Sequence, residues 1–248
     1  MIISRQNSLV KLIRSLSNKK NRDKEGLYII EGAKLVNEAI TLGLPIYKIV
    51  GHPIGLGLIG EKTFNYPTEI VSKDIFSYIS DEIAPQGVLA LIKKPNVKIS
   101  APTGNCLFLD GVSDSSNVGA IIRTAAASNF NEVYIANGAD AYSPKSVRAS
   151  MGGIFRIKVF SGTREQLLNA INIPLVIADM KGENVFNLNI DQNFCLVIGN
   201  EAHGVSDTLR GKAKYSVCIP MAKGVESLNA AVSAGILMYI LNKSAKGE

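Results

Sequence analysis

Short apolar runs alternate with amphipathic stretches along almost the whole chain of 248 residues. In the first third, apolar spacing predicts helices over 7–16, 33–43 and 73–82, and strands over 27–32, 46–52, 69–72 and 87–94. The polar, highly charged stretch 17–26 carries no such spacing and is interpreted as a loop. This order predicts one small α/β unit.

A second unit follows the stretch 95–105, which has two prolines and no apolar periodicity, and the predicted linker is 96–104. From Cys106 on, nearly continuous apolar runs indicate strands buried on both faces of a sheet, at 106–110, 133–136, 155–160, 175–179, 195–200 and 216–220. Helical patterns separate them, at 117–128, 144–151, 164–171 and 206–211, and a last helix is predicted over 226–241. Strand–helix alternation predicts the α/β class with a mostly parallel sheet.

One glycine motif is set aside. GLGLIG at 55–60 matches the dinucleotide fingerprint G-x-G-x-x-G, but Asn65 and Pro67 leave no room for the long helix that the fingerprint requires. The segment is interpreted as a flexible glycine loop.

Composition narrows the function classes. No apolar run reaches the length of a membrane span, and the first residues mix charged with apolar positions, unlike a secretory signal. A soluble, cytoplasmic protein without a membrane partner is expected. The three cysteines stand in apolar runs without a C-x-x-C pair, which predicts buried thiols, and two isolated histidines predict no metal site.

Charge is concentrated at one end. The formal net charge is +6, and residues 1–24 alone hold seven basic residues against the single acid Asp23, so the rest of the chain is balanced. Such a segment is typical of contact with a polyanion, although a solvated basic helix face is an equally ordinary explanation. The candidate nucleic-acid-binding residues are Arg5, Lys19, Lys20, Arg22 and Lys24.

Three segments carry candidate chemistry. In the first, Asn117 suits a helix start, and Arg123 follows six residues later in an uncharged, alanine-rich stretch. An arginine in such a helix needs an anionic partner, and phosphate is the obvious one. We therefore expect Arg123 to contact a phosphate group.

The second and third segments place polar groups after apolar runs. Gly199-Asn200-Glu201 follows a buried strand, where open α/β sheets bind ligands, and Gly204 precedes a helix. In the third segment, Ser227 and Asn229 are predicted at the mouth of the last helix, with Asn229 inside it. Asparagine is unfavourable inside a helix, so Asn229 is expected to have a specific polar partner.

Together the segments resemble the three signature motifs of the TrmH (SpoU) branch of the SPOUT superfamily, the RNA ribose 2′-O-methyltransferases. The first is N-x5-R (Asn117, Arg123), and the second is G-N-E-x-x-G (Gly199 to Gly204). The third is I-P-M…S-L-N, beginning at Ile219 and ending at Asn229. All three occur in the family order across about 105–241. Residues 1–95 also resemble, more loosely, the L30e-like domain that often precedes this catalytic domain.

The resemblance implies an L30e-like RNA-binding domain at 1–95, the linker at 96–104 and a methyltransferase domain at 105–248 with a C-terminal trefoil knot. It implies homodimers and S-adenosylmethionine as cofactor. The cofactor-binding residues it implies are Gly199, Asn200, Ile219, Met221 and Leu228. A third knot loop would lie at 178–182.

The implied reaction is attack by a ribose 2′-hydroxyl on the sulfonium methyl group, which needs no metal. Arg123 would orient the phosphate and stabilise the developing alkoxide, because a guanidinium is too weakly acidic to serve readily as a base. The residues that would position it and the ribose are Asn117, Glu201, Ser227 and Asn229. 23S rRNA is the expected substrate. The alternatives are tRNA, or an RNA-binding or ribosome-assembly factor without catalytic activity. The sequence does not indicate the target nucleotide.

Overall fold

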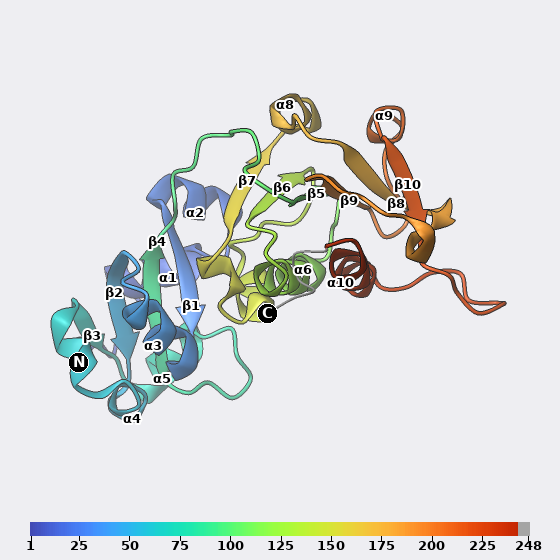
Figure 1. Ribbon diagram of the computed structural model, residues 1–248. Helices are drawn as coiled ribbons and strands as arrows, with labels where there is room; N and C mark the ends of the chain where they lie inside the picture. Colours follow the sequence, from blue (N-terminus) through green and yellow to red (C-terminus); the bar gives the residue numbers. More distant parts are fainter. Residues whose placement is uncertain (243–248) are drawn as a thin grey trace. The chain divides into compact units, whose positions relative to one another are not determined.

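The computed structural model describes residues 1–242, and the chain divides into two compact units. The first comprises Met1–Asn96 together with Tyr142–Phe155, and the second comprises Val97–Ala141 and the chain from Arg156 onward (Figure 1). Both units are α/β, so the predicted fold class is confirmed. The last six residues of the predicted domain 105–248 lie outside the described residues.

The first unit is built on a four-stranded sheet of order β1-β4-β2-β3. The strands are β1 (Leu27–Glu31), β2 (Ile46–Gly51), β3 (Thr68–Ile70) and β4 (Val88–Lys93), with β4 antiparallel to both β1 and β2 and β2 parallel to β3. Its helices are α1 (Ser8–Ser15), α2 (Lys19–Glu25), α3 (Ala33–Thr41), α4 (Pro53–Gly57), the 3-10 helix η1 (Gly60–Asn65) and α5 (Lys73–Ile79). Apolar residues of α1 and α5 pack on β2 and β4 in one buried cluster, which includes Ile13, Phe76 and Leu89.

A segment distant in sequence completes this unit. Helix α7 (Pro144–Ser150) and the 3-10 helix η2 (Gly153–Phe155) pack with it, and α7 contacts β1. The rings of Tyr142 and Tyr28 lie 5.0 Å apart, and Arg148 pairs with Glu82 at 3.4 Å. The sequence did not predict that residues 142–155 belong to the first unit, because their local pattern does not differ from that of a helix in the second unit.

The second unit contains a six-stranded, wholly parallel sheet of order β10-β8-β9-β5-β6-β7. The strands are β5 (Cys106–Asp110), β6 (Glu132–Ala136), β7 (Lys158–Gly162), β8 (Leu175–Asn184), β9 (Cys195–Gly199) and β10 (Tyr215–Cys218). Its helices are α6 (Ser115–Ala127), α8 (Arg164–Ala170), η3 (Val185–Asn187), α9 (Asp207–Arg210) and α10 (Ala230–Leu241). The predicted parallel sheet is confirmed.

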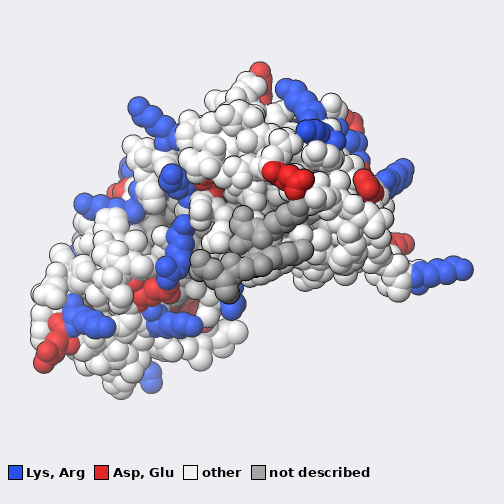
Figure 2. All heavy atoms as spheres, viewed as in Figure 1, with Lys and Arg blue, Asp and Glu red and all other residues white. Residues whose placement is uncertain are grey.

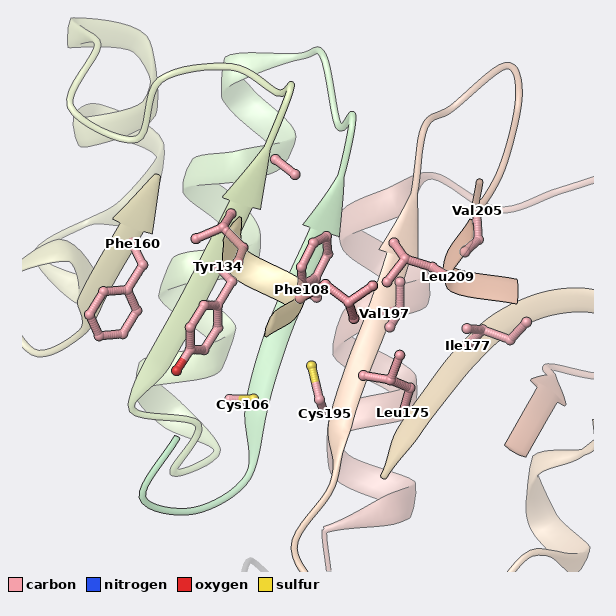
Figure 3. Packing of buried hydrophobic residues seen from close by; sticks show 13 residues of the cluster. Cys106, Phe108, Tyr134, Phe160, Leu175, Ile177, Cys195, Val197, Val205 and Leu209 are labelled. Carbon is pink, nitrogen blue, oxygen red and sulfur yellow. The ribbon is translucent and has the colours of Figure 1, made fainter. Parts of the chain in front are cut away.

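Two layers of helices cover this sheet. In Figure 1, α6 and α10 lie side by side on one face, and α8 and α9 lie on the other. Figure 3 shows the core under α8 and α9, where Phe108, Tyr134 and Val197 come from neighbouring strands. Cys106 and Cys195 are buried register partners there, whereas Cys218 is only half-buried, so the prediction of buried thiols holds for two of three cysteines.

The strand order places a switch point between β5 and β9. From β5 the chain proceeds outward through β6 and β7, and it then returns to form β8, β9 and β10 on the other side of β5. Asp110 and Gly199 are register partners at the ends of these two strands. Ligands of open α/β sheets bind at the carboxyl ends of strands at such a point.

The backbone is tightly packed around β8 and β10. These strands pair in parallel with a register shift between Ser216 and Val217, and a Cβ atom at Gly182 would lie 2.5 Å from the amide nitrogen of Val217. The two chain segments therefore cross in direct backbone contact. The trefoil knot itself stays a prediction.

Four sequence-based expectations about local structure were wrong. Residues 17–26 contain helix α2 in place of a loop, and the glycine segment 55–60 is taken up by α4 and the start of η1. Helix α6 is capped by Asp114, so Asn117 lies within its first turn, not at the cap. Helix α10 begins at Ala230 with Asn229 as its N-cap, so Asn229 is not interior.

Helix α2 forms in a polar sequence because its ends and one buried arginine are satisfied. Asn18 caps it by accepting from the amide of Lys20 at 2.9 Å, and Gly26 ends it in the left-handed region. Arg22 is only 2% exposed and donates to the carbonyls of Leu16 and Ser17 at 2.7 and 2.8 Å. This arginine therefore joins α2 to the end of α1.

No helix within residues 1–242 has the length and apolar character needed to cross a membrane.

Arg22→Ala is expected to lower the free energy of unfolding by about 1–3 kcal/mol, because it leaves two carbonyls without their donor. Lys20→Ala, an exposed position of the same helix, should change it by less than about 0.5 kcal/mol. Urea unfolding followed by circular dichroism measures both, and equal effects of the two changes would contradict the role of Arg22.

Candidate active site

The site lies at the carboxyl ends of β5 and β9. Asp110, at the end of β5, is 2% exposed and accepts from Arg164 Nε at 2.7 Å and from the amide of Ser206 at 2.8 Å. One carboxylate thus ties β5 to the start of α8 and to the loop after β9. A charge this deeply buried requires such partners.

The loop after β9 is held in a closed turn by Asn200. Its backbone amide and carbonyl bond with those of Gly204 at 3.0 and 2.9 Å. Its side chain donates to the carbonyl of Gly111 at 2.8 Å and accepts from the amides of Ala202 and His203. Gly199 is required just before the turn, since a Cβ atom there would lie 2.2 Å from the carbonyl carbon of Gly204.

A chain of hydrogen bonds joins the three motif segments, and we call it the amide relay. Glu201 accepts from Asn117 Nδ2 at 2.9 Å and from the amide and hydroxyl of Ser113 at 3.2 and 3.0 Å. Asn117 Oδ1 accepts from Asn229 Nδ2 at 2.9 Å. Asn229 Oδ1 in turn accepts from the first amides of α10. The specific polar partner expected for Asn229 is therefore Asn117.

The amide relay also controls the charge of Glu201. Partial burial acts to raise the pKa of Glu201, but hydrogen bonds from Asn117 and Ser113 outweigh it and lower the pKa to about 2. Glu201 is therefore an ionised acceptor at neutral pH, and its role in the relay is to fix the Asn117 amide.

Two adjoining cavities open beside the amide relay. The larger, about 950 Å³, is lined by residues 178–181 of β8, by the end of β9 and the loop after it, and by the start of α10. Its lining includes three of the five predicted cofactor-binding residues, Gly199, Asn200 and Leu228. It also includes the predicted positioning residues Glu201, Ser227 and Asn229. Ile219 and Met221 line the smaller cavity, about 120 Å³, which shares Ser227 and Leu228 with the larger one.

Arg123 does not line either cavity. It lies six residues after Asn117, about 9 Å further along α6, and its side chain is exposed. Within residues 1–242 it has no hydrogen bond or ion pair. Small side chains around it pack against α10 of the same chain, where Tyr239 approaches the carbonyl of Ala127 at 3.5 Å. The anionic partner expected for Arg123 is thus not supplied by the described part of the chain.

The predicted RNA-binding residues fall into different environments. Arg22 is buried on backbone carbonyls, and its assignment to RNA contact was wrong for that reason. Lys19 pairs with Asp23 at 2.5 Å and Lys24 with Glu25 at 3.5 Å. Arg5 and Lys20 are exposed without an acidic partner among the described residues.

Sequence reasoning missed an ion pair in the cavity wall. Arg210 of α9 pairs with Asp179 of β8, and both line the larger cavity. Asp179 ends the apolar run 175–179 in the sequence, as Asp110 ends the run 106–110, and this was the available signal. Arg210 had none, because its partner lies on a distant strand. No group of three or more potential metal ligands occurs in residues 1–242.

Profiles of known families match both parts of the chain. That of the SpoU rRNA Methylase family matches residues 104–239, and that of the MRM3-like substrate binding domain matches residues 7–90. A 23S rRNA (guanosine(2553)-2'-O)-methyltransferase, RlmP, of Bacillus subtilis is 30% identical over 97% of this chain and 98% of its own length. A 23S rRNA (uridine(2479)-2'-O)-methyltransferase of Streptomyces viridochromogenes is 29% identical over 90% of this chain and 85% of its own.

Solved structures resemble the whole chain. An AdoMet-bound rRNA methyltransferase from Sinorhizobium meliloti superposes with a TM-score of 0.85 at 28% identity, covering 96% of this chain and 95% of that one. The SpoU methyltransferase AviRb from Streptomyces viridochromogenes, in complex with AdoMet, superposes with a TM-score of 0.82 at 25% identity, covering 95% and 97%.

Glu201→Gln is expected to flatten the dependence of stability on pH in acid. The pKa of Glu201 is about 2 when folded and ordinarily 4.5, so its carboxylate contributes stability that is complete above pH 4.5 and lost as the pH falls toward 2. Urea unfolding across that interval should show a smaller loss for the variant than for the wild type. The exposed Glu165→Gln on α8 is the control and should follow the wild type. Parallel curves for Glu201→Gln and wild type would refute the interpretation.

Proposed function

The chain belongs to the SpoU rRNA methylase family, and on that premise we propose that its substrate is 23S rRNA. It is an S-adenosylmethionine-dependent methyltransferase that acts on a ribose 2′-hydroxyl of RNA. In this chain the catalytic site is marked by the amide relay, which brings Asn117, Glu201 and Asn229 of the three motifs together beside one cavity. The proposal of 23S rRNA as substrate rests on the relatives. RlmP and the Streptomyces relative both methylate 23S rRNA by name.

The larger cavity fits the cofactor in size and chemistry. Its volume of about 950 Å³ is within the range of small-molecule sites, and Ile198, Val205 and Leu228 supply apolar surface beside polar Asp179 and Ser227. Gly199, Asn200 and Leu228 would hold the cofactor there, with Ile219 and Met221 in the adjoining cavity. When bound, S-adenosylmethionine supplies an electrophilic methyl group.

Each polar residue then has a distinct role toward the ribose. The Arg123 guanidinium stays charged, so it orients a phosphate and stabilises negative charge developing on the 2′-oxygen. Asn117, Glu201 and Asn229 hold the loops in place through the amide relay. Ser227 lies in both cavity walls and makes no side-chain hydrogen bond within residues 1–242, which leaves its hydroxyl available to the ribose.

We further propose that the enzyme acts as a homodimer in which Arg123 serves the site of the other protomer. Two features of the chain support this. Arg123 is exposed and unpaired among the described residues, as given above. Helix α10 presents Val232 and Tyr239, which are 50% and 48% exposed and seven residues apart, and therefore lie on one face. An apolar face of this kind suits contact with a second copy.

The division of labour follows the predicted domains. We propose that 1–95 is an L30e-like RNA-binding domain, that 96–104 is a linker and that 105–248 is the methyltransferase domain. The profile match at 7–90 supports the first assignment. In the linker, Thr103 is held by Glu132 at 2.8 and 3.1 Å. Because bacterial ribosomes are assembled in the cytoplasm, we also propose a cytoplasmic location.

Gly199→Ala is expected to weaken S-adenosylmethionine binding about tenfold or more, or about 1.4 kcal/mol. The added methyl group would lie 2.2 Å from the Gly204 backbone, so the loop that lines the cavity must move. Gly211→Ala is the matched control, since a Cβ atom there meets its nearest neighbour at 3.4 Å. Isothermal calorimetry measures both. A wild-type chain without specific binding heat would instead indicate an RNA-binding factor without catalytic activity.

Arg123→Ala is expected to abolish methyl transfer to an unmodified 23S rRNA transcript while leaving S-adenosylmethionine binding intact. Transfer of labelled methyl groups and calorimetry measure the two properties, and Lys212→Ala, another exposed cation of the second unit, controls for loss of charge. Full activity of Arg123→Ala would overturn its assignment.

Mixing Arg123→Ala with Gly199→Ala, at an S-adenosylmethionine concentration too low to saturate Gly199→Ala, tests the homodimer. A dimer of one Arg123→Ala protomer and one Gly199→Ala protomer has one complete site if Arg123 serves the other protomer. Partial recovery of methyl transfer is therefore expected after mixing, and no recovery would show that Arg123 acts within its own protomer.

A further inference from the structure

Basic side chains are spread over the face of the molecule shown in Figure 2, several of them beside acidic ones. Their pairing therefore decides which of them remain available to a polyanion. The first acidic residue of the chain is Asp23, which accepts from Lys19 and from Lys94, each at 2.5 Å. Asp23 is thus paired with Lys19 of α2 and with Lys94, the residue after β4. Nothing acidic within residues 1–22 balances the cations there.

Four exposed cations of residues 1–22 have no acidic partner in residues 1–242: Lys20 on α2, and Arg5, Lys11 and Arg14 on α1 or before it. Arg5, Lys11 and Arg14 are exposed, and no ion pair joins them to any residue in 1–242. Lys11 and Arg14 are three positions apart in α1, so they share one face of that helix. Helix α1 contains no acidic residue. Most of the unpaired charge thus lies on α1 and the residues before it, whereas on α2 Lys19 and Lys24 are paired and Lys20 alone is exposed without an acidic partner.

The aromatic ring of Tyr78 contacts two of these cations, Arg5 and Arg14. The guanidinium carbon of Arg5 lies 4.5 Å from the centroid of the Tyr78 ring, and that of Arg14 lies 5.1 Å from the same centroid. Both are within the range of cation–π contact. The two like charges are consequently no further apart than about 10 Å, which is the Debye length at 0.1 M salt.

Packing of the first unit places these groups together. Ile2 pairs with Val71, its amide donating to Ile70 at 2.7 Å, so the segment before α1 lies along β3 and the start of α5. Asn7 caps α1 by accepting from the amide of Leu9 at 2.9 Å. Helix α1 packs on α5, which carries Tyr78 near its end. Arg5 and Arg14 therefore reach the ring from two separately anchored segments.

The contact with the Tyr78 ring leaves the N–H donors of both guanidiniums free. A cation–π contact uses the face of the guanidinium, whereas its N–H donors point outward in the plane of the group. Neither guanidinium donates a hydrogen bond to residues 1–242. Two planar groups with free donor edges, held by an aromatic ring, suit bidentate bonding to phosphodiester oxygens.

We propose that Arg5, Arg14 and Tyr78 form a phosphate clamp through which the first unit binds the backbone of its RNA substrate. The proposal rests on the RNA methyltransferase function and assigns its RNA contact to α1 and the preceding turn. Tyr78 orients the two arginines before RNA arrives, which reduces the entropy lost on binding. The contact is to backbone, so it contributes affinity without reading sequence.

The test measures binding of an unmodified 23S rRNA transcript to the full chain at several salt concentrations. Arg5→Gln/Arg14→Gln should weaken binding about tenfold at 0.1 M salt and reduce the slope of log K against log salt by about 1.5, because two phosphate contacts are lost. Lys19→Gln/Lys24→Gln is the matched control. It also removes two charges from the first 24 residues, but from cations that are already paired, and it should change the slope less.

Variants of Tyr78 test whether the ring orients the two arginines, because they leave the charge of both arginines unchanged. Tyr78→Leu keeps both arginines and should weaken RNA binding, whereas Tyr78→Phe keeps the ring and should retain it. Thermal unfolding checks that each variant is folded. An equal loss in the lysine control, or unchanged binding by folded Tyr78→Leu, would overturn the clamp. If wild-type chain transfers methyl groups and the arginine variant binds RNA normally, only the clamp fails. If wild-type chain transfers none, the proposed function fails.

Discussion

The active site depends on one side-chain amide, that of Asn117, both polar atoms of which are used. Its nitrogen donates to Glu201 and its oxygen accepts from Asn229, residues 84 and 112 positions away in the chain. A carboxylate only accepts, and the Asn229 oxygen is occupied by the amides of α10, so each amide has a single orientation. Three loops are thereby held in one arrangement, and the cavity beside them keeps its shape.

That arrangement also explains what each part of the site contributes. Gly199 and Asn200 shape the loop through backbone contacts, and Glu201 serves as a fixed anion, since its hydrogen bonds keep its pKa far below the neutral range. None of these groups carries a positive charge. Arg123, the cation to which we assign the catalytic charge, lies on α6 with its side chain exposed, outside this set of residues. The proposed homodimer would bring this cation to the cavity of the other protomer.

In the first unit, the partner of each basic side chain decides whether its charge is available to a ligand. Seven basic residues in 1–24 look equivalent in sequence, yet Arg22 is buried on carbonyls, and Lys19 and Lys24 are paired with acids. Arg5 and Arg14 instead meet at the ring of Tyr78. The contrast arises because α2 contains acids one turn away or adjacent to its lysines, whereas α1 contains none.

The sequence alone determined the α/β class, the parallel sheet of the second unit and the family, because apolar periodicity and motif spacing are local properties. It also identified Asn117, Glu201 and Asn229 as polar positions after strands or at helix starts. Only the tertiary structure decided that these three bond to one another, that Asn229 caps α10 and that α2 is a helix. It alone placed 142–155 in the first unit and paired Asp179 with Arg210. Such contacts join residues far apart in the chain, and no local pattern encodes which distant group a side chain meets when the sheet closes.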